Sequence, residues 1–108
     1  MDLVIEAGYI YTVEDLDYTD FIKIGCTTNI PKRLKAYNTD RPFNRVRLLC
    51  VSKKFIDVRF VEKQILLGLK EIGVLPIANR AEWFQREHEP KLVNAIIAAE
   101  KDLITIRG

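Results

Sequence analysis

The chain has 108 residues, of which 48% are apolar and 30% are charged, which is typical of one folded globular domain and not of a disordered segment. No apolar run approaches the roughly 20 residues of a membrane span, and residues 1–6 lack the basic start of a signal peptide. We therefore expect residues 1–108 to form a single cytoplasmic domain with no membrane partner.

The net charge of +2 is distributed unevenly along the chain. Residues 1–20 contain six acidic side chains and no basic one, whereas residues 28–54 contain eight basic side chains and one acid, Asp40. A basic middle segment is typical of a surface that binds phosphate groups, although a solvated face without a partner is the alternative. The candidate phosphate contacts in this segment are Lys32, Lys35, Arg41, Arg45, Lys53 and Lys54.

The first half of the chain predicts two strands and a short helix. Residues 8–13 are β-branched and aromatic, as strands prefer, and the acidic residues 14–20 indicate a loop. Residues 21–26 form a second short strand, so the two are expected to pair as an antiparallel hairpin. Capping side chains at residues 27–29, followed by Pro31, predict a helix that ends near Tyr37.

The second half predicts a third strand at residues 45–51 and two helices. Apolar residues recur at three- and four-residue steps over 57–72, which indicates an amphipathic helix that Gly73 ends. Residues 74–81 are a crossing loop, and a last helix begins near Glu89 and buries Leu92, Val93, Ile96 and Ile97. The predicted fold is α+β, a small three-stranded antiparallel sheet flanked by helices in the order β-β-α-β-α-α.

The two cysteines, Cys26 and Cys50, have no metal-ligand spacing. In a chain with no export signal, we expect both to be reduced and buried.

Three polar positions stand out against these predicted elements. Strand alternation places Tyr9 and Tyr11 on one face, and Lys23 shares that face if the two strands have the right register; otherwise Lys23 points to water. Glu62 borders the apolar stripe of its predicted helix. A carboxylate there is costly unless it is paired with Arg59, three residues earlier, or bound to a cation.

The sequence elements Gly8-Tyr9-Ile10-Tyr11, Lys23-Ile24-Gly25, Arg33, Glu62 and Glu82-Trp83-Phe84 together resemble the GIY-YIG nuclease superfamily. The resemblance covers residues 8–84 and is greatest to the phage and large-DNA-virus branch, whose second motif reads Lys-Ile-Gly and whose domain closes with Glu-Trp-Phe. Lys23 stands where the name-giving motif has its second tyrosine, and Leu66 stands where the branch often has a histidine.

The resemblance implies a role for each of these residues. Tyr11 and Lys23, with Tyr9 on the same face, would activate water, and either Tyr11 or Lys23 is the base. Lys23 could serve if burial and neighbouring cations help to remove its proton. Arg33 would stabilise phosphate charge in the transition state, and Glu62 would hold Mg²⁺ or Mn²⁺. Asn79 would orient the catalytic face or a phosphate, Glu82 would anchor Arg33 or Arg80, and Trp83 and Phe84 would pack.

The implied function is a metal-dependent DNA endonuclease that nicks with low sequence specificity. A double-strand break would need a homodimer or a partner protein. Two alternatives remain open at this stage. One is a DNA-binding module without turnover, and the other is a protein-interaction domain that uses the apolar loop of residues 74–77.

Overall fold

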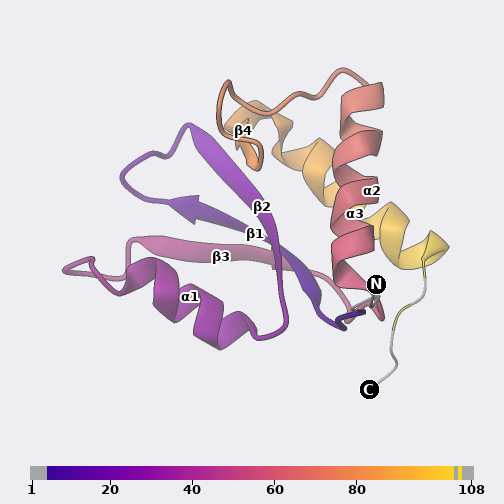
Figure 1. The fold of residues 1–108 in the computed structure, drawn as a ribbon. Helices are drawn as coiled ribbons and strands as arrows, with labels where there is room; N and C mark the ends of the chain where they lie inside the picture. Colours follow the sequence, from indigo (N-terminus) through magenta and orange to yellow (C-terminus); the bar gives the residue numbers. More distant parts are fainter. Residues whose placement is uncertain (1–4, 104, 106–108) are drawn as a thin grey trace.

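The computed structural model describes residues 5–103 and 105, and within them the chain forms a four-stranded sheet and three α-helices (Figure 1). The strands are β1 (Tyr9–Asp15), β2 (Phe21–Thr27), β3 (Val46–Val51) and β4 (Trp83–Gln85), arranged in the order β3-β1-β2-β4. The helices are α1 (Ile30–Asn38), α2 (Val58–Glu71) and α3 (Glu89–Asp102), and a 3-10 helix, η1 (Arg86–His88), precedes α3.

The predicted α+β class with an antiparallel sheet and flanking helices is confirmed, but the prediction of three strands is wrong. The fourth strand, β4, pairs with residues 21–23 of β2. It has only three residues, too few for an alternating pattern to be visible in the sequence. The predicted loop at 14–20 is also too long, because Glu14 and Asp15 complete β1 opposite Arg47 and Val46.

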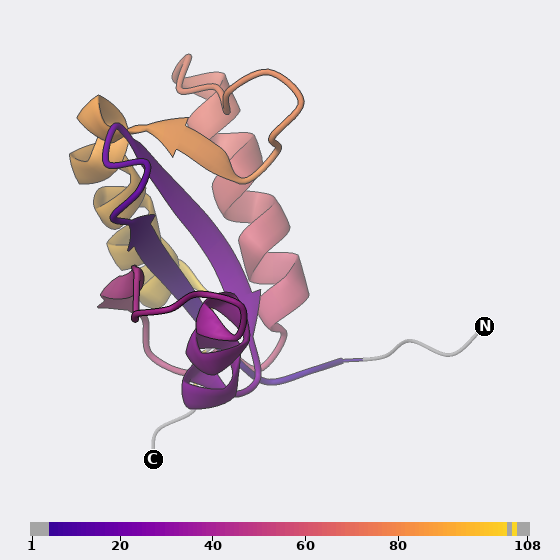
Figure 2. The same cartoon turned by 90° about the vertical axis from the view of Figure 1, so that its left-hand side faces the viewer.

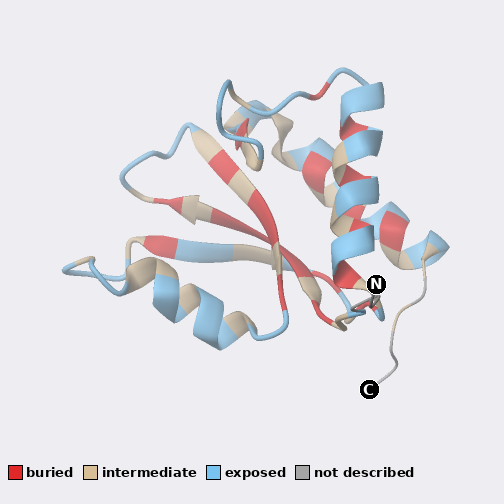
Figure 3. Cartoon of the chain, in the orientation of Figure 1, coloured by how far each residue is buried: buried red, intermediate tan, exposed pale blue. Residues whose placement is uncertain are grey.

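The sheet lies between α1 on one face and α2 with α3 on the other (Figures 1 and 2). Ile10, Ile22 and Ile24 point toward α2 and α3 and form the larger core. Tyr11 and Val13 point the opposite way, toward the inner side of α1. Because helices cover both faces, the central strand β1 is buried along most of its length (Figure 3).

Local signals explain the ends of α1 and α2. The side chain of Asn29 accepts a hydrogen bond from the Lys32 amide at 3.0 Å and caps α1, and Pro31 occupies its first turn. Asp57 caps α2 by accepting from the Phe60 amide, and Gly73 ends it with a φ of +79°. No helix in the described part of the chain is long and apolar enough to cross a membrane.

The buried face of α3 differs from the prediction. Leu92 and Ile96 are buried as expected, but Val93 is only half-buried and Ile97 is 44% exposed. Ala99 is buried instead, because the residues that face α2 follow three- and four-residue steps from Leu92.

Candidate active site

Tyr11 of β1 and Gly25 of β2 form a cross-strand pair. Tyr11 lies directly opposite Gly25, and an added Cβ at Gly25 would lie 2.6 Å from the Tyr11 hydroxyl oxygen. The missing side chain at Gly25 therefore gives the Tyr11 phenol its place across β2. At the end of that ring, the hydroxyl groups of Tyr11 and Tyr37 of α1 hydrogen-bond at 2.7 Å.

The Tyr11 phenol is held in its neutral form. Its side chain is 2% exposed, and burial raises its pKa well above the ordinary value of a tyrosine. The hydrogen bond with Tyr37 raises the pKa further, while the nearby Arg33 guanidinium opposes the shift. Tyr37 was not among the sequence-predicted site residues. The available signal was its position four residues after Arg33, which places both on one side of α1.

Lys23 lies on the same face of the sheet as Tyr11, two residues before Gly25 and opposite Val13. Its Nζ is 3.9 Å from Oε2 of Glu82, 5.1 Å from the ring centroid of Tyr37 and 5.9 Å from that of Trp83. A carboxylate and two aromatic faces all interact favourably with a positive charge. The surroundings of Lys23 therefore suit an ammonium group. Glu82 contacts Lys23, which differs from its predicted contact with Arg33 or Arg80.

Arg33 connects the tyrosine pair with Glu62. It borders the small hollow that Tyr11 and Tyr37 share, and it also lines a cavity of about 430 Å³ at the far end of β2. Glu62 of α2, with Cys26 and Thr27 of β2, lines the same cavity. β4 pairs only with residues 21–23, so the edge of β2 is open where this cavity lies. Helices from both sides of the sheet thus contribute side chains at one strand end.

Glu62 is a partly compensated carboxylate in this cavity. Its Oε2 is buried and has no hydrogen-bond partner among the described residues. Burial raises the pKa of Glu62, and the negative charge of Glu82 raises it further, whereas Cys26, Lys23 and Arg33 lower it by smaller amounts. The alternative pairing with Arg59 is not formed, because Arg59 makes its ion pair with Glu6 at 3.6 Å.

The cysteines are free and half-buried, and Cys26 belongs to this site. Burial and the neighbouring carboxylate of Glu62 raise the pKa of the Cys26 thiol to about 12, so it remains a neutral thiol. Cys26 was not predicted to lie at the site. Its proximity to Glu62 depends on how α2 crosses β2, which no local sequence pattern specifies.

Two other predicted residues lie outside this cavity. Tyr9 is half-buried on β1 opposite Thr27, and it is not among the described residues that line the cavity. Asn79 is exposed and has a φ of +62°, a left-handed conformation that asparagine tolerates in turns. Its local role is to turn the loop before β4.

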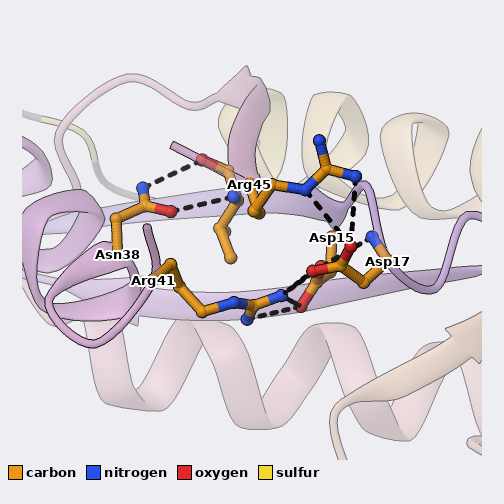
Figure 4. A network of polar contacts seen from close by, with 6 residues as sticks. Asp15, Asp17, Asn38, Arg41 and Arg45 are labelled. Carbon is orange, nitrogen blue, oxygen red and sulfur yellow. Dashed lines mark hydrogen bonds and ion pairs between the residues drawn. The ribbon is translucent and has the colours of Figure 1, made fainter. Parts of the chain in front are cut away.

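The predicted DNA contacts fall into two groups. Lys32 and Lys35 are exposed on α1, Lys53 is exposed after β3, and Lys54 beside it is half-buried. Arg41 and Arg45 instead belong to the ion-pair network in Figure 4.

In that network, the Arg41 guanidinium donates to both carboxylate oxygens of Asp15 at 2.8 and 3.0 Å and also contacts Asp17. Arg45 donates to Asp17 at 3.1 Å (Figure 4). Hydrogen bonds from Arg41 and then Arg45 lower the pKa of Asp17. Acidic residues of the β1–β2 turn therefore offset part of the basic charge counted in the middle segment. The same arginines hold the loop between α1 and β3 against that turn.

No group of three histidine, cysteine or acidic side chains suited to a metal ion occurs among residues 5–103 and 105. A cation at this site would therefore rely on Glu62 as its protein ligand and on water or phosphate oxygens for the rest. This ligand set suits Mg²⁺, which keeps several waters when it binds proteins. The buried Glu62 oxygen without a partner fits such an ion, because a cation would replace the missing donor.

Comparison with known proteins identifies the family. Residues 8–100 match the family model described as the T5orf172 domain, so the chain belongs to the T5orf172 domain family. This is a phage-associated domain with a nuclease-related fold. No curated protein and no solved structure matches the chain.

The contact between Gly25 and Tyr11 predicts a stability effect. Gly25→Ala should lower the free energy of unfolding by about 1–3 kcal/mol, because the new methyl group must displace the Tyr11 ring. Gly68→Ala is the matched control. Nothing lies within 4 Å of a Cβ at Gly68, which is inside α2, and alanine there should raise stability by about 0.5–1 kcal/mol. Urea unfolding measures both; equal effects would contradict the packing argument.

The raised pKa of Glu62 predicts that this residue lowers the free energy of unfolding by an amount that depends on pH. The folded state binds this proton more tightly than the unfolded state, so ionised Glu62 destabilises the fold at neutral pH. Glu62→Gln should therefore be more stable than wild type at neutral pH. The difference should shrink as pH falls through the raised folded-state pKa toward the ordinary value for glutamate of about 4.3.

Thermal melting across this pH range measures the effect. Glu71→Gln, exposed on the same helix, is the control and should change the melting temperature little at any pH. A Glu62→Gln protein that is less stable than wild type at neutral pH would show that the carboxylate is compensated by contacts in solution.

Proposed function

We propose that this T5orf172 domain is a metal-dependent DNA endonuclease of the GIY-YIG type that nicks DNA with low sequence specificity. The observation that supports the proposal is the position of Arg33, which borders the hollow of Tyr11 and also lines the cavity of Glu62, whose Oε2 has no partner among the described residues. A buried carboxylate oxygen without a donor is costly to the fold, and a bound cation would remove that cost.

The candidate metal ligand is Glu62, and the ion would be Mg²⁺ or Mn²⁺. When bound, the cation would supply positive charge to the phosphate and to the oxygen that leaves it. Arg33 is exposed and lines the same cavity, so its guanidinium can donate two hydrogen bonds to one phosphate group. Cation and guanidinium would then neutralise charge from two sides, which stabilises the transition state more than the substrate.

Tyr11 and Lys23 take different parts in this proposal from those expected from the sequence. Burial keeps the Tyr11 phenol protonated, and the neighbours of Lys23 favour its positive charge. We infer that Lys23 acts as a fixed cation near the phosphate and that the Tyr11 hydroxyl orients the attacking water, whose proton is released to solvent as the new P–O bond forms and the bond to the leaving oxygen breaks. The hydrogen bond with Tyr37 fixes the direction of that hydroxyl.

The DNA backbone is proposed to follow the exposed basic side of α1 toward the end of β3, past Lys32, Lys35 and Lys53. These lysines would provide sequence-independent attraction that weakens as salt concentration rises. Asn79 and Lys54 are proposed as peripheral contacts. Arg41 and Arg45 would contribute only if DNA displaced Asp15 and Asp17 from them.

A supercoiled-plasmid assay with Mg²⁺ or Mn²⁺ tests the proposal. Wild type should convert plasmid to the nicked circle, and Glu62→Gln should abolish nicking while it binds DNA as well or better, because a negative charge is removed. Arg33→Ala should lose rate far more than affinity. Lys53→Ala is the control. It should lower the affinity for DNA and change the rate at which bound DNA is nicked only a little.

A second readout does not depend on turnover. Mn²⁺ should raise the melting temperature of wild type and leave that of Glu62→Gln unchanged. DNA binding without nicking, and without any effect of Mn²⁺ on melting, would favour the alternative of a DNA-binding module. Nicking by Glu62→Gln at the wild-type rate would contradict the metal assignment.

The role of Lys23 predicts the outcome of a pair of substitutions. Lys23→Arg keeps the positive charge and should retain substantial nicking with an unchanged pH profile, whereas Lys23→Met should lose most activity with similar folding. A base at this position would give the opposite result, since arginine does not release a proton at neutral pH. An inactive Lys23→Arg protein with normal DNA affinity would therefore return the base role to Lys23.

A further inference from the structure

An aromatic pocket of about 380 Å³ lies at the end of β2 away from Glu62. Its walls come from the turn between β1 and β2, from the start of β2, and from the segment that leads into β4. The lining residues are Asp15, Tyr18, Phe21, Ile77, Arg80 and Trp83. The volume is near the low end of the roughly 300–1,000 Å³ that is typical of ligand sites, so the pocket suits a single ring system.

Strand alternation places this pocket on the sheet face that carries the candidate active site. Phe21 is two residues before Lys23 on β2, and Trp83 lies directly opposite Lys23 on β4. The neighbour of Trp83, Phe84, points the other way and is buried in the larger core. Trp83 is left half-buried at the pocket, with its ring centroid 5.9 Å from the Lys23 Nζ. The pocket therefore adjoins Lys23.

Backbone hydrogen bonds hold both turns that line the pocket. In the turn of residues 15–21, the amide of Tyr18 donates at 2.8 Å and its carbonyl accepts at 3.1 Å. Three amide-to-carbonyl bonds of 2.8 to 3.0 Å close the segment of residues 77–83. The left-handed Asn79 belongs to this second turn and directly precedes Arg80, which it brings to the pocket. The walls are thus formed before any ligand binds, which lowers the entropy lost on binding.

The walls suit a neutral planar ring better than an anion. Tyr18 is 63% exposed, and Arg80 is exposed and has no ion-pair partner among the described residues. Aromatic faces and a guanidinium plane both stack on planar rings. Asp15 would repel a phosphate from the interior, and its carboxylate is already bonded by Arg41 (Figure 4). A phosphate attached to the ring would instead lie outside, near Arg80 and Lys23.

Strand β2 connects this pocket with the cavity that contains Glu62. Phe21 begins the strand at the pocket, and Thr27 ends it at the cavity that Arg33 also lines. The two ends are about 20 Å apart at the usual rise of a strand. A DNA strand with one phosphate at Arg33 therefore reaches the pocket within a few nucleotides. Bases inside a duplex are paired and stacked and cannot enter such a pocket, whereas an unpaired base can.

We propose that this pocket binds one unpaired base of the DNA strand that crosses β2. The preferred substrate is then DNA with unpaired nucleotides beside the cut. This inference rests on the proposed function, because the path of the strand starts from the phosphate at Arg33. Stacking on aromatic rings accepts every base, which agrees with a nuclease of low sequence specificity.

Trp83 is the only tryptophan in the chain, so its fluorescence reports directly on the pocket. The full chain is titrated without divalent cations, which leaves the DNA uncut. A short single-stranded oligothymidine should quench the emission, because a base stacks on the aromatic wall. An abasic strand of the same length keeps the phosphates but has no bases, and it should quench little. A blunt duplex should also quench little.

Substitutions of Tyr18 separate stacking from charge. Tyr18→Ala should weaken the affinity for oligothymidine about 10-fold and leave that for the abasic strand unchanged, since only the ring is lost. Tyr18→Phe keeps the ring and should bind as wild type does. Phe43→Ala is the matched control, because Phe43 is an exposed aromatic residue outside the pocket. Melting curves verify that each variant is folded.

Four results would overturn the proposal. They are quenching by the abasic strand or by the duplex equal to that by oligothymidine, thymidine monophosphate that binds as tightly as the strand, and Tyr18→Ala with unchanged affinity. Glu62→Gln should be quenched as wild type is, so the pocket and the metal site fail separately. A wild type that nicks plasmid but is not quenched would retain the proposed function and refute the base pocket. Quenching without nicking would support the pocket and count against the nuclease.

Discussion

The close contact between Tyr11 and Gly25 is the constraint on which the arrangement of Tyr11, Tyr37 and α1 depends. A side chain at position 25 would occupy the place of the Tyr11 hydroxyl, so a buried phenol and a glycine are required together. The phenol then extends to Tyr37 and joins the sheet to α1. Since α1 has no fully buried residue of its own, this contact acts with the packing of Ile30 and Leu34 and the Asn38–Val46 hydrogen bonds to fix the helix, and with it Arg33.

The charged groups around Glu62 do not fully stabilise its ionised carboxylate. Burial and the charge of Glu82 raise the pKa of Glu62, and Cys26, Lys23 and Arg33 only partly oppose this shift. Lys23 is already engaged with Glu82 and the ring of Tyr37, so it cannot also neutralise Glu62. Among the described residues, the Glu62 Oε2 therefore keeps no donor. A divalent cation would take that place, and a phosphate bound to it would lie in the cavity that Arg33 lines.

Local patterns predicted the fold well, and long-range contacts explain what they missed. Periodicity and capping predicted α2 almost to its ends, because Asp57 and Gly73 act within a few residues of themselves. Short β4 had no pattern to recognise, since its existence depends on pairing with β2. Charge counting could not show the partner of Arg41 for the same reason: Asp15 lies 26 positions earlier and is brought close only by the sheet.

The buried stripe of α2 determines where Glu62 lies. Val58, Val61, Ile65 and Leu69 hold the helix to the sheet, and Glu62 lies at the border of that stripe, in the cavity that Cys26 and Thr27 of β2 also line. Because close packing fixes the stripe, it also fixes the Glu62 carboxylate in the cavity that Arg33 of α1 enters from the other side of the sheet.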